Sequence, residues 1–434
     1  MKIKLRTEHL IFLLSLSINI IITILSSNSL MWDENVYLAN AKHVLGITPY
    51  FEHFRFPLLW WNIALLIPLI KENYLLVRIY LSIIFSVSTV FFYRILLKTL
   101  KEDWKAIIFT LLIILNGLMI IYSNRIYPDV YGMSFLIISI YSFHNYLESK
   151  RERDFIFFIL FSILSFLAKY PYGLFLLSSW IFVDRKEKMR SIAYSILFLT
   201  PFFLYNLLLY KNPIKILLDQ FYLAYLWQTK EPISLFFENA LRYLGILIFS
   251  VFFIPIKDGK FERSIYLFTL LSFIYFAFLT PQKDPRYLIQ ILPTSIIIFG
   301  INTEKLKGFE LLIYILLSFS MIYSTINGIF DTTNINLCYG ELSSAYQSVQ
   351  FLKKENATKV LSNAFWVWYG NLLNIESYSI YNNSLDYFVE KYDPDFIVYS
   401  KNYGISVELN LSRYRKVFEY MDFCGIDVKI YRVR

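Results

Sequence analysis

Long apolar runs separated by short polar or basic stretches dominate the first 330 residues. The first run covers His9 to Leu25. Ten more follow at about 74–97, 106–122, 130–147, 155–168, 172–183, 191–210, 236–256, 264–280, 288–302 and 309–329. Many of them reach or approach the roughly 20 residues that a helix needs to cross a bilayer. The pattern therefore predicts a polytopic α-helical membrane protein with about eleven transmembrane helices.

One apolar stretch, residues 56–70, does not fit this series. It is short and contains Pro57 and Pro68. If it crossed the membrane, every later basic loop would lie outside, against the rule that basic loops stay in the cytoplasm. Apolar runs of about 10–14 residues are often interfacial or re-entrant. We therefore interpret this stretch as a segment that does not cross.

The orientation follows from the first helix. Basic residues precede His9, which predicts a cytoplasmic N-terminus. No Ala-x-Ala site follows Leu25, so an uncleaved helix is favoured over a signal peptide. The first outer loop then covers residues 28–73 and contains Asp33 and Glu34. An odd number of spans also places the C-terminal part outside the cell.

The composition of the chain changes at about Asp331, from long apolar runs to a more polar sequence. Strand-like runs at 359–362, 377–381, 395–399 and 428–431 alternate with helix-like runs at 344–353 and 385–392. This alternation predicts a small extracytoplasmic α/β domain at 331–434, after a membrane domain at 1–330. Both cysteines, Cys338 and Cys424, fall in this part. A disulfide and two buried thiols are equally compatible with the sequence, because sequence separation does not fix a Cα distance.

Composition excludes two broad classes of protein. The chain is 57% hydrophobic and 17% charged, whereas soluble domains are roughly 45–50% apolar and about 25% charged. A soluble enzyme is therefore excluded. The net charge of +9 comes mostly from short basic clusters between apolar runs, as expected for cytoplasmic loops. No basic, Gly-rich or RNP-like stretch indicates nucleic-acid binding.

Ionisable residues gather in the predicted outer loops. Groups of this kind at membrane depth are costly and usually line a functional cavity. Carboxylates there suggest a general base or a metal ligand, and several Arg and Lys suggest an anion such as phosphate. Together they suit transfer of a group from a lipid-linked phosphate. The residues are Asp33, Glu34, Glu52, His53, Arg55, Arg125, Asp129, Lys169, Lys283, Asp284 and Arg286.

Simpler structural roles remain open for several of these residues. Asp33 could cap a helix with Glu34 in its first turn, and Asp129 could cap the helix that starts next to it. Lys169 could be a snorkelling lysine and Arg286 an interfacial anchor. His53 could be a solvated loop residue, and the four scattered histidines do not form a zinc site.

The order of several short motifs resembles a known family. Asp33-Glu34 is followed by Tyr37, then by Pro57-Leu58, Tyr127-Pro128-Asp129, Lys169-Tyr170-Pro171, and Lys283-x-x-Arg286-Tyr-Leu with Pro293 beyond. This series, over roughly residues 1–300, resembles the GT-C glycosyltransferases. It is most similar to their protein O-mannosyltransferase and aminoarabinose transferase-like branch, some members of which carry a similar outer α/β domain.

The resemblance implies an enzyme that moves a hexose or pentose from a polyprenyl-phosphate (dolichyl-phosphate) donor to an acceptor hydroxyl. Transfer would occur on the extracytoplasmic face of the cell membrane, with inversion at the anomeric carbon. The acceptor would be a protein, a lipid or a glycan of the cell envelope. No cofactor is certain, a divalent metal is possible, and no metal ligands are assigned.

The resemblance also suggests roles for individual residues. Asp33 matches the first-loop aspartate that activates the acceptor, with Glu34 as its support, and Asp129 matches the second carboxylate. Arg55 stands where many members have the lysine of a Lys-Pro-Pro-Leu element that contacts donor phosphate, although here the element reads Arg55-Phe56-Pro57-Leu58. The remaining assignments are Lys169, Arg286 and Lys283 for donor phosphate, and Tyr37, His53, Arg125 and Tyr127 for the acceptor and sugar.

Other functions also fit part of the pattern. An oligosaccharyltransferase or polymer ligase would share the topology, but Trp60-Trp61 lacks the acidic residue of a Trp-Trp-Asp acceptor motif. A lipid-glycan flippase or transporter would favour polar residues at mid-span and paired broken helices. A structural protein with an exposed interaction domain would tolerate changes of the outer carboxylates.

Overall fold

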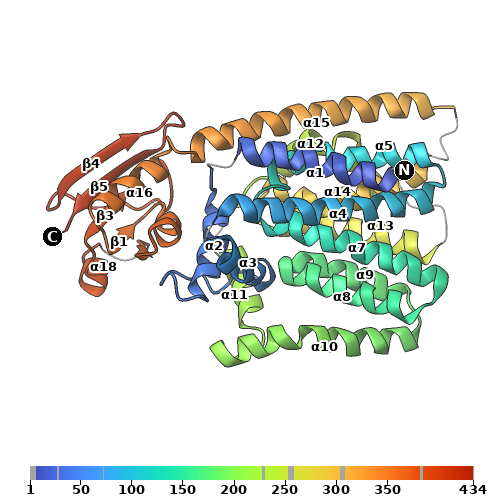
Figure 1. The fold of residues 1–434 in the computed structure, drawn as a ribbon, viewed down its shortest axis with the longest axis horizontal. Coiled ribbons are helices and arrows are strands. Elements are labelled where there is room, and N and C mark those ends of the chain that lie inside the picture. The colour runs from blue at the N-terminus through green and yellow to red at the C-terminus, as the bar shows by residue number, and fades with distance from the viewer. Residues whose placement is uncertain are drawn as a thin grey trace, which may run out of the picture. The chain divides into compact units, whose positions relative to one another are not determined.

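The computed structural model describes residues 6–26, 29–71, 73–226, 230–252, 259–303, 308–381 and 385–433. The chain forms two compact units (Figure 1). The first comprises Met1–Thr23, Phe54–Leu59 and Arg78–Phe330, and the second comprises Ile24–His53, Trp60–Val77 and Asp331–Arg434. The second unit thus includes much of the predicted first outer loop as well as the C-terminal part.

Within the described residues, each of the eleven predicted apolar segments is helical, and positions 253–256 of the 236–256 segment lie outside them. Two are interrupted: α5 and α6 share the 106–122 segment, and α12 continues into the 3₁₀ helix η2. The helices are α1 (Thr7–Leu25), α4 (Tyr74–Leu100), α5 (Asp103–Ile114), α6 (Gly117–Tyr122), α7 (Pro128–Ser149), α8 (Glu152–Ala168), α9 (Leu174–Phe182), α10 (Arg185–Tyr210), α12 (Ile233–Tyr243), η2 (Gly245–Phe252), α13 (Lys260–Ile274), α14 (Leu288–Thr303) and α15 (Glu310–Tyr339).

Fewer helices than the eleven predicted are long and apolar enough to cross a membrane. Among the described residues, five helices are long and apolar enough to cross, or six if the bent pair α12 and η2 forms one span. The others are shorter or more polar, so the count of eleven spans stays a prediction. Figure 1 shows the long helices of the first unit running along a common direction.

The segment at 56–70 forms a separate short helix, α3 (Pro57–Ile70). Its 14 residues span about 21 Å at 1.5 Å per residue, less than the roughly 30 Å of a bilayer core. Helices α5 and α9, which belong to predicted spans, are shorter still, so the interpretation that α3 does not cross stays a prediction.

Helix α14 forms the centre of the first unit. All of its residues are buried, and it packs against α5, α7 and α13. Small residues allow close approach elsewhere in this unit. A Cβ on Gly117 of α6 would lie 2.1 Å from the Ser324 carbonyl oxygen of α15, so only glycine fits there. The apolar segments thus pack as a bundle around one buried helix.

The second unit contains a five-stranded mixed sheet in the order β2-β1-β3-β5-β4. Strands β1, β2 and β3 are parallel, and β5 runs antiparallel to both β3 and β4. Strand β4 is the one strand absent from the sequence-based expectation. The elements are α16 (Ser344–Lys354), β1 (Lys359–Ser362), α17 (Trp366–Trp368), the π-helix η5 (Tyr369–Leu373), β2 (Glu376–Ser379), α18 (Leu385–Tyr392), β3 (Phe396–Tyr399), β4 (Arg415–Met421) and β5 (Asp427–Arg432).

A disulfide joins the two cysteines of the second unit. Cys338 in the last turn of α15 bonds to Cys424 in the turn between β4 and β5, with a Cα–Cα distance of 5.6 Å. Of the two states that the sequence left open, the structure contains the bridge. Disulfides form and persist in oxidising compartments.

Helix α2 (Trp32–His43) belongs to the second unit and packs into its core. It contacts α17 and η5, and its Val36 side chain is part of the hydrophobic cluster built on the sheet. The helix carrying the predicted Asp33 is therefore held by residues from the far end of the chain.

Candidate functional site

Two predicted residues, Asp129 and Lys169, form a buried ion pair in the first unit. Pro128 is the first residue of α7, which places Asp129 in the first helical turn. The Asp129 carboxylate does not cap the helix; its Oδ1 accepts a hydrogen bond from the Lys169 ammonium. Only 2% of the Asp129 side chain and 17% of the Lys169 side chain are exposed.

Glycine and tyrosine fix the geometry of this pair. The Tyr172 hydroxyl donates to the Asp129 carbonyl oxygen at 2.6 Å. A Cβ on Gly132 would lie 2.7 Å from the Tyr172 ring, so glycine at this position lets the ring reach the start of α7. The tyrosine and Lys169 belong to one short turn, and this contact therefore positions the lysine as well.

The turn itself, Lys169 to Gly173, is held from α14. Helix α8 ends at Ala168, and Lys169 is extended, with φ of −155°. The Gln290 amide donates to the Pro171 carbonyl at 3.0 Å and to the Ser272 hydroxyl at 2.9 Å. Burial lowers the pKa of Lys169, as does the nearby Arg286, and the Asp129 carboxylate opposes both.

Arg286 lies beside this pair on the short helix η4 (Pro285–Tyr287). Asp284 caps η4 by accepting the Arg286 amide at 3.0 Å, and its carboxylate lies 3.1 Å from the Arg286 Nε. The guanidinium sits 5.4 Å from the centre of the Tyr127 ring and 5.9 Å from that of Tyr287. The Lys169 ammonium lies 4.7 Å from the same Tyr287 ring. Tyr287 thus stands next to both cations, and the predicted Tyr127 supports the arginine.

Arg55 belongs to the first unit, and the neighbouring Phe56 packs against aromatic residues of that unit. The Phe56 ring lies 5.8 Å from the Tyr170 ring and 5.5 Å from the Phe166 ring. The Arg55 guanidinium lies 5.2 Å from the Phe54 ring. The start of α3 is therefore anchored next to the turn that carries Lys169.

Lys283 has a different environment. Its ammonium donates to the carbonyl oxygens of Phe276 at 3.1 Å, of Ala277 at 2.9 Å and of Thr280. Burial lowers the pKa of this lysine. These three carbonyl oxygens, at the end of the helical segment that begins with α13, can accept all three hydrogens of the ammonium group. The geometry therefore gives the predicted phosphate-binding role of Lys283 no support.

Two buried polar groups near Asp129 lack partners within the described part of the chain. The Asp129 Oδ2 and both ends of the Asn124 side-chain amide have no hydrogen-bond partner there. Asn124 is fully buried, and the predicted Arg125 beside it is 1% exposed. A buried amide without partners costs roughly 1–3 kcal/mol, so the loop between α6 and α7 carries polar groups that a bound ligand or water would satisfy.

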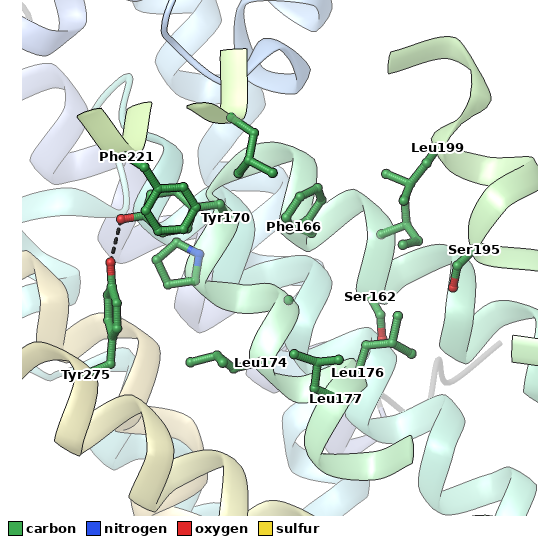
Figure 2. Close-up of a pocket in the computed structure, with 14 residues that line it drawn as sticks. Ser162, Phe166, Tyr170, Leu174, Leu176, Leu177, Ser195, Leu199, Phe221 and Tyr275 are labelled. Carbon is green, nitrogen blue, oxygen red and sulfur yellow. Dashed lines mark hydrogen bonds between the residues drawn. The ribbon is translucent and has the colours of Figure 1, made fainter. Parts of the chain in front are cut away.

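An apolar cavity of about 370 Å³ lies next to the Lys169 turn. Figure 2 shows Tyr170 and Tyr275 at one side of it, joined through their hydroxyl groups at 2.6 Å. Almost all of its lining is aliphatic or aromatic. The lining residues are Ser162, Ile163, Phe166, Tyr170, Pro171, Gly173, Leu174, Leu176, Leu177, Ser195, Leu199, Leu217, Phe221 and Tyr275.

The remaining predicted residues belong to the second unit. Met31 precedes α2 as its cap residue, and Glu34 accepts the Met31 amide at 3.0 Å. Glu34 thus caps the start of α2, and its expected support of Asp33 stays a prediction. Asp33 and Tyr37 are buried on α2, at 8% and 4% exposure, whereas His53 is exposed. Asp33 and Asp129 therefore lie in different units.

Sequence reasoning missed three contributors to the cluster in the first unit: Tyr287, Tyr172 and Gln290. The tyrosines lie within three residues of Arg286 and Lys169, so a search around each predicted cation would have found them. Gln290 gave no such signal, because its partner Pro171 is 119 residues away. Within the described ranges, no three His, Cys, Asp or Glu side chains gather as metal ligands. The suggested divalent metal stays a prediction.

Comparison with known proteins identifies the fold. No family model matches the sequence, and no curated protein matches it either. The structure of ArnT from Cupriavidus metallidurans bound to undecaprenyl phosphate does match, with a TM-score of 0.71 and 10% identity over 97% of each chain. This chain has the fold of ArnT. The structure of ArnT in the apo state matches with a TM-score of 0.67 and 11% identity, over 96% of this chain and 97% of that one.

ArnT is an aminoarabinose transferase with the GT-C fold. The predicted fold class is therefore confirmed: the chain is a polytopic α-helical membrane protein with a C-terminal α/β part. The match covers 97% of this chain, so both units belong to the ArnT fold. At 10% identity, the likeness to ArnT establishes architecture, and function has to be argued from the site.

Proposed function

We propose that this protein is a membrane glycosyltransferase that moves a sugar from a polyprenyl-phosphate donor to an acceptor hydroxyl. The observation that carries the proposal is the cluster of Asp129, Lys169 and Arg286 beside an apolar cavity, in a fold shared with ArnT bound to undecaprenyl phosphate. A phosphate needs cations, and an isoprenoid chain needs an apolar surface. Both features occur around one turn, Lys169 to Gly173.

The donor phosphate would lie against the basic residues of the first unit. Arg286 is the strongest candidate, since its planar guanidinium can bind two phosphate oxygens and two tyrosine rings hold it in place. Arg55 would contribute from the start of α3. Lys169 already pairs with Asp129, so we assign it to the electrostatic field around the phosphate and not to a bidentate contact.

The isoprenoid chain would enter the apolar cavity. Tyr170 and Pro171 line it and directly follow Lys169 in the chain. A chain held there would bring its phosphate end toward the cations. Burial of apolar surface contributes roughly 25 cal/mol per Å², which favours a long lipid over a soluble nucleotide sugar.

The proposed chemistry is a single displacement. The Asp33 carboxylate accepts the proton of the acceptor hydroxyl as the hydroxyl oxygen bonds to the anomeric carbon. The bond from that carbon to the phosphate oxygen breaks on the opposite side, and the configuration inverts. Arg286 and Arg55 stabilise the charge left on the polyprenyl phosphate. Asp129 orients the acceptor or a cation through its second oxygen, with Arg125 and Tyr127 beside it.

We further propose that the reaction takes place outside the cytoplasm. The N-terminus would be cytoplasmic, and both α2 and the α/β domain extracytoplasmic. The disulfide supports this orientation, because such bonds persist in oxidising compartments. The sugar would be a hexose or a pentose, and the acceptor a protein, lipid or glycan.

The first prediction concerns Asp33. Asp33→Asn keeps the size of the side chain but removes the base, so transfer should fall at least about 100-fold. The assay uses purified protein in nanodiscs with undecaprenyl-phosphate-linked mannose, glucose or aminoarabinose, and measures release of undecaprenyl phosphate in the presence of an envelope extract as acceptor.

Asp395→Asn in the same unit serves as the control and should retain activity. Full activity in Asp33→Asn would refute the assigned base. Movement of the intact donor across the bilayer without release of undecaprenyl phosphate would favour a flippase instead.

A further inference from the structure

Helix α2, which carries Asp33, is unusually polar for a buried helix. All ten residues from Asp33 to Lys42 are buried. Burying polar groups is unfavourable unless they are hydrogen-bonded, so the partners of the polar residues on α2 determine where the helix can sit.

Most of these partners lie outside the helix. The Asn40 amide donates to the Glu52 carbonyl at 2.9 Å and accepts the Glu52 amide at 2.9 Å. The Asn35 amide nitrogen donates to the Met31 carbonyl at 2.9 Å. These contacts join α2 to the chain segments directly before and after it. A second face of the helix contacts the C-terminal part of the chain.

On that face, Asn371 of η5 contacts the helix at two points. Its side-chain nitrogen donates to the Asn35 Oδ1 at 2.8 Å, and its backbone carbonyl accepts from the Lys42 ammonium at 2.7 Å. Asn35 and Lys42 are seven residues apart, which is two helical turns on one face. Asn371 is fully buried, and one residue thus clamps α2 near both ends.

The backbone around Asn371 is built for this contact. It lies in a π-helix, Tyr369–Leu373, a form that is rare and often marks functional sites. Next to it, the Gly370 carbonyl accepts from the Thr48 hydroxyl at 2.7 Å. A Cβ on Gly370 would lie 2.5 Å from the Tyr50 ring. The π-helix is therefore closely fitted to the loop that follows α2.

We propose that Asn371 is a positioning residue for transfer: the α/β domain clamps α2 through Asn371, and this clamp orients the Asp33 carboxylate. Asn35, the partner of Asn371, is only two residues from Asp33 and lies in the same first turn of α2. The inference rests on the proposed role of Asp33 as the base. It assigns the C-terminal domain a part in the chemistry, through the helix and not through contact with the substrate.

The test is a double-mutant cycle on kcat with Asn371→Ala, Asn35→Ala and the double variant, in the undecaprenyl-phosphate sugar assay. A misplacement of about 1 Å can cost roughly 100-fold in rate, so each single variant should lose about 10- to 100-fold in kcat. The KM for the lipid donor should stay within about twofold, because the donor residues belong to the other unit. The double variant should be no slower than the slower single variant, since both remove one interaction.

Hydrogen exchange supplies a readout that does not depend on activity. Amides of residues 33–43 should exchange at least about 10-fold faster in Asn371→Ala than in the wild type. Asp386→Ala is the matched control: it removes an exposed ion pair between α18 and Arg413 in the same unit, and it should leave both kcat and exchange in α2 unchanged.

The outcomes separate the two proposals. If Asp33→Asn is inactive while Asn371→Ala keeps its kcat and the protection of α2, the clamp is refuted and the proposed function stands. If Asp33→Asn is fully active, the proposed base is refuted. Faster exchange in Asn371→Ala with unchanged kcat would also refute a positioning role.

Discussion

At the scale of single residues, the Asp129–Lys169 pair shows how the site is held. Both groups are buried, and their charges compensate each other. Replacing a buried pair by apolar residues is often neutral for stability, whereas removing one partner is costly. Stability and function of this pair can therefore be separated by mutation.

Lys169→Met should lower the free energy of unfolding by about 3 kcal/mol, because it leaves the Asp129 carboxylate buried without its counter-charge. The double variant Lys169→Met/Asp129→Leu should recover most of that loss and remain inactive. Thermal unfolding in detergent and the transfer assay measure the two effects.

Lys98→Met is the control for a solvent-exposed pair. Lys98 lies 2.5 Å from Glu148 with 34% of its side chain exposed, and such pairs contribute about 0–1 kcal/mol. An equal loss of stability in Lys98→Met and Lys169→Met would contradict the argument from burial.

From the sequence, candidate side chains could be grouped where they are close in the chain. Asp129 and Tyr127 were found together, and so were Arg286 and its neighbours, because each set lies within one loop. Lys283 was grouped with them for the same reason, yet its ammonium binds helix carbonyls. The sequence shows which loop a side chain belongs to, but it does not show the direction in which that side chain points.

At the scale of elements, the parallel strands of the second unit depend on one aspartate. Asp395 precedes β3, and its Oδ2 accepts the Thr358 amide at 2.7 Å, the Thr358 hydroxyl at 2.8 Å and the Lys359 amide at 3.0 Å. The carboxylate thus joins the start of β1 to the start of β3. Burial alone would raise the pKa of Asp395, but these hydrogen bonds outweigh it and lower the pKa.

A group with a lowered folded pKa stabilises the fold above its unfolded pKa, about 3.9 for aspartate, and loses that effect as the pH falls through the folded value. Asp395→Asn should therefore lower the Tm at pH 7, and the gap to the wild type should narrow between pH 7 and pH 3. Near-UV circular dichroism of the full chain measures both melting curves. A gap that is constant over this range would show that the charge of Asp395 does not matter.

Helices and strands could be predicted from the sequence where the spacing of apolar residues had a clear helical or strand period. The strands β1, β2, β3 and β5 and the helices α16 and α18 were expected from alternation in the sequence. Strand β4 was missed because charged, exposed residues at Arg415, Lys416 and Glu419 interrupt its pattern, although its apolar residues pack against the core of the second unit. The sequence left open a helix that starts at Asp33, but the burial of α2 could not be predicted, because its partners lie more than 300 residues away in the chain.

At the scale of the whole molecule, hydropathy predicted the fold class but not the grouping of segments. The helices of the first unit follow the apolar runs closely. The assignment of residues 24–53 and 60–77 to the C-terminal unit depends on contacts such as Asn35 with Asn371, 336 residues apart. No local pattern encodes a contact at that separation.

The proposed orientation predicts where the disulfide lies. Cys338 and Cys424 are the two cysteines of the chain. In intact cells, a membrane-impermeant maleimide should label them only after reduction by an impermeant phosphine, and permeabilisation should not be needed. Labelling that requires permeabilised cells would place the second unit inside.

A cysteine at a predicted cytoplasmic position provides the matched control. Arg151→Cys in a Cys338→Ser/Cys424→Ser background should be labelled only after permeabilisation. Labelling of Arg151→Cys from outside would invert the proposed topology.

The clamp between α2 and Asn371 also sets an order of events during synthesis. Asn35 leaves the ribosome 336 residues before its partner, which is roughly 17 to 70 s at about 5–20 residues per second. During that interval the helix with the proposed base has already been made, but its anchor does not yet exist. We therefore expect a nascent chain, or one released before residue 371, to lack an ordered base, and the proposed transfer to begin only after residue 371 has been translated.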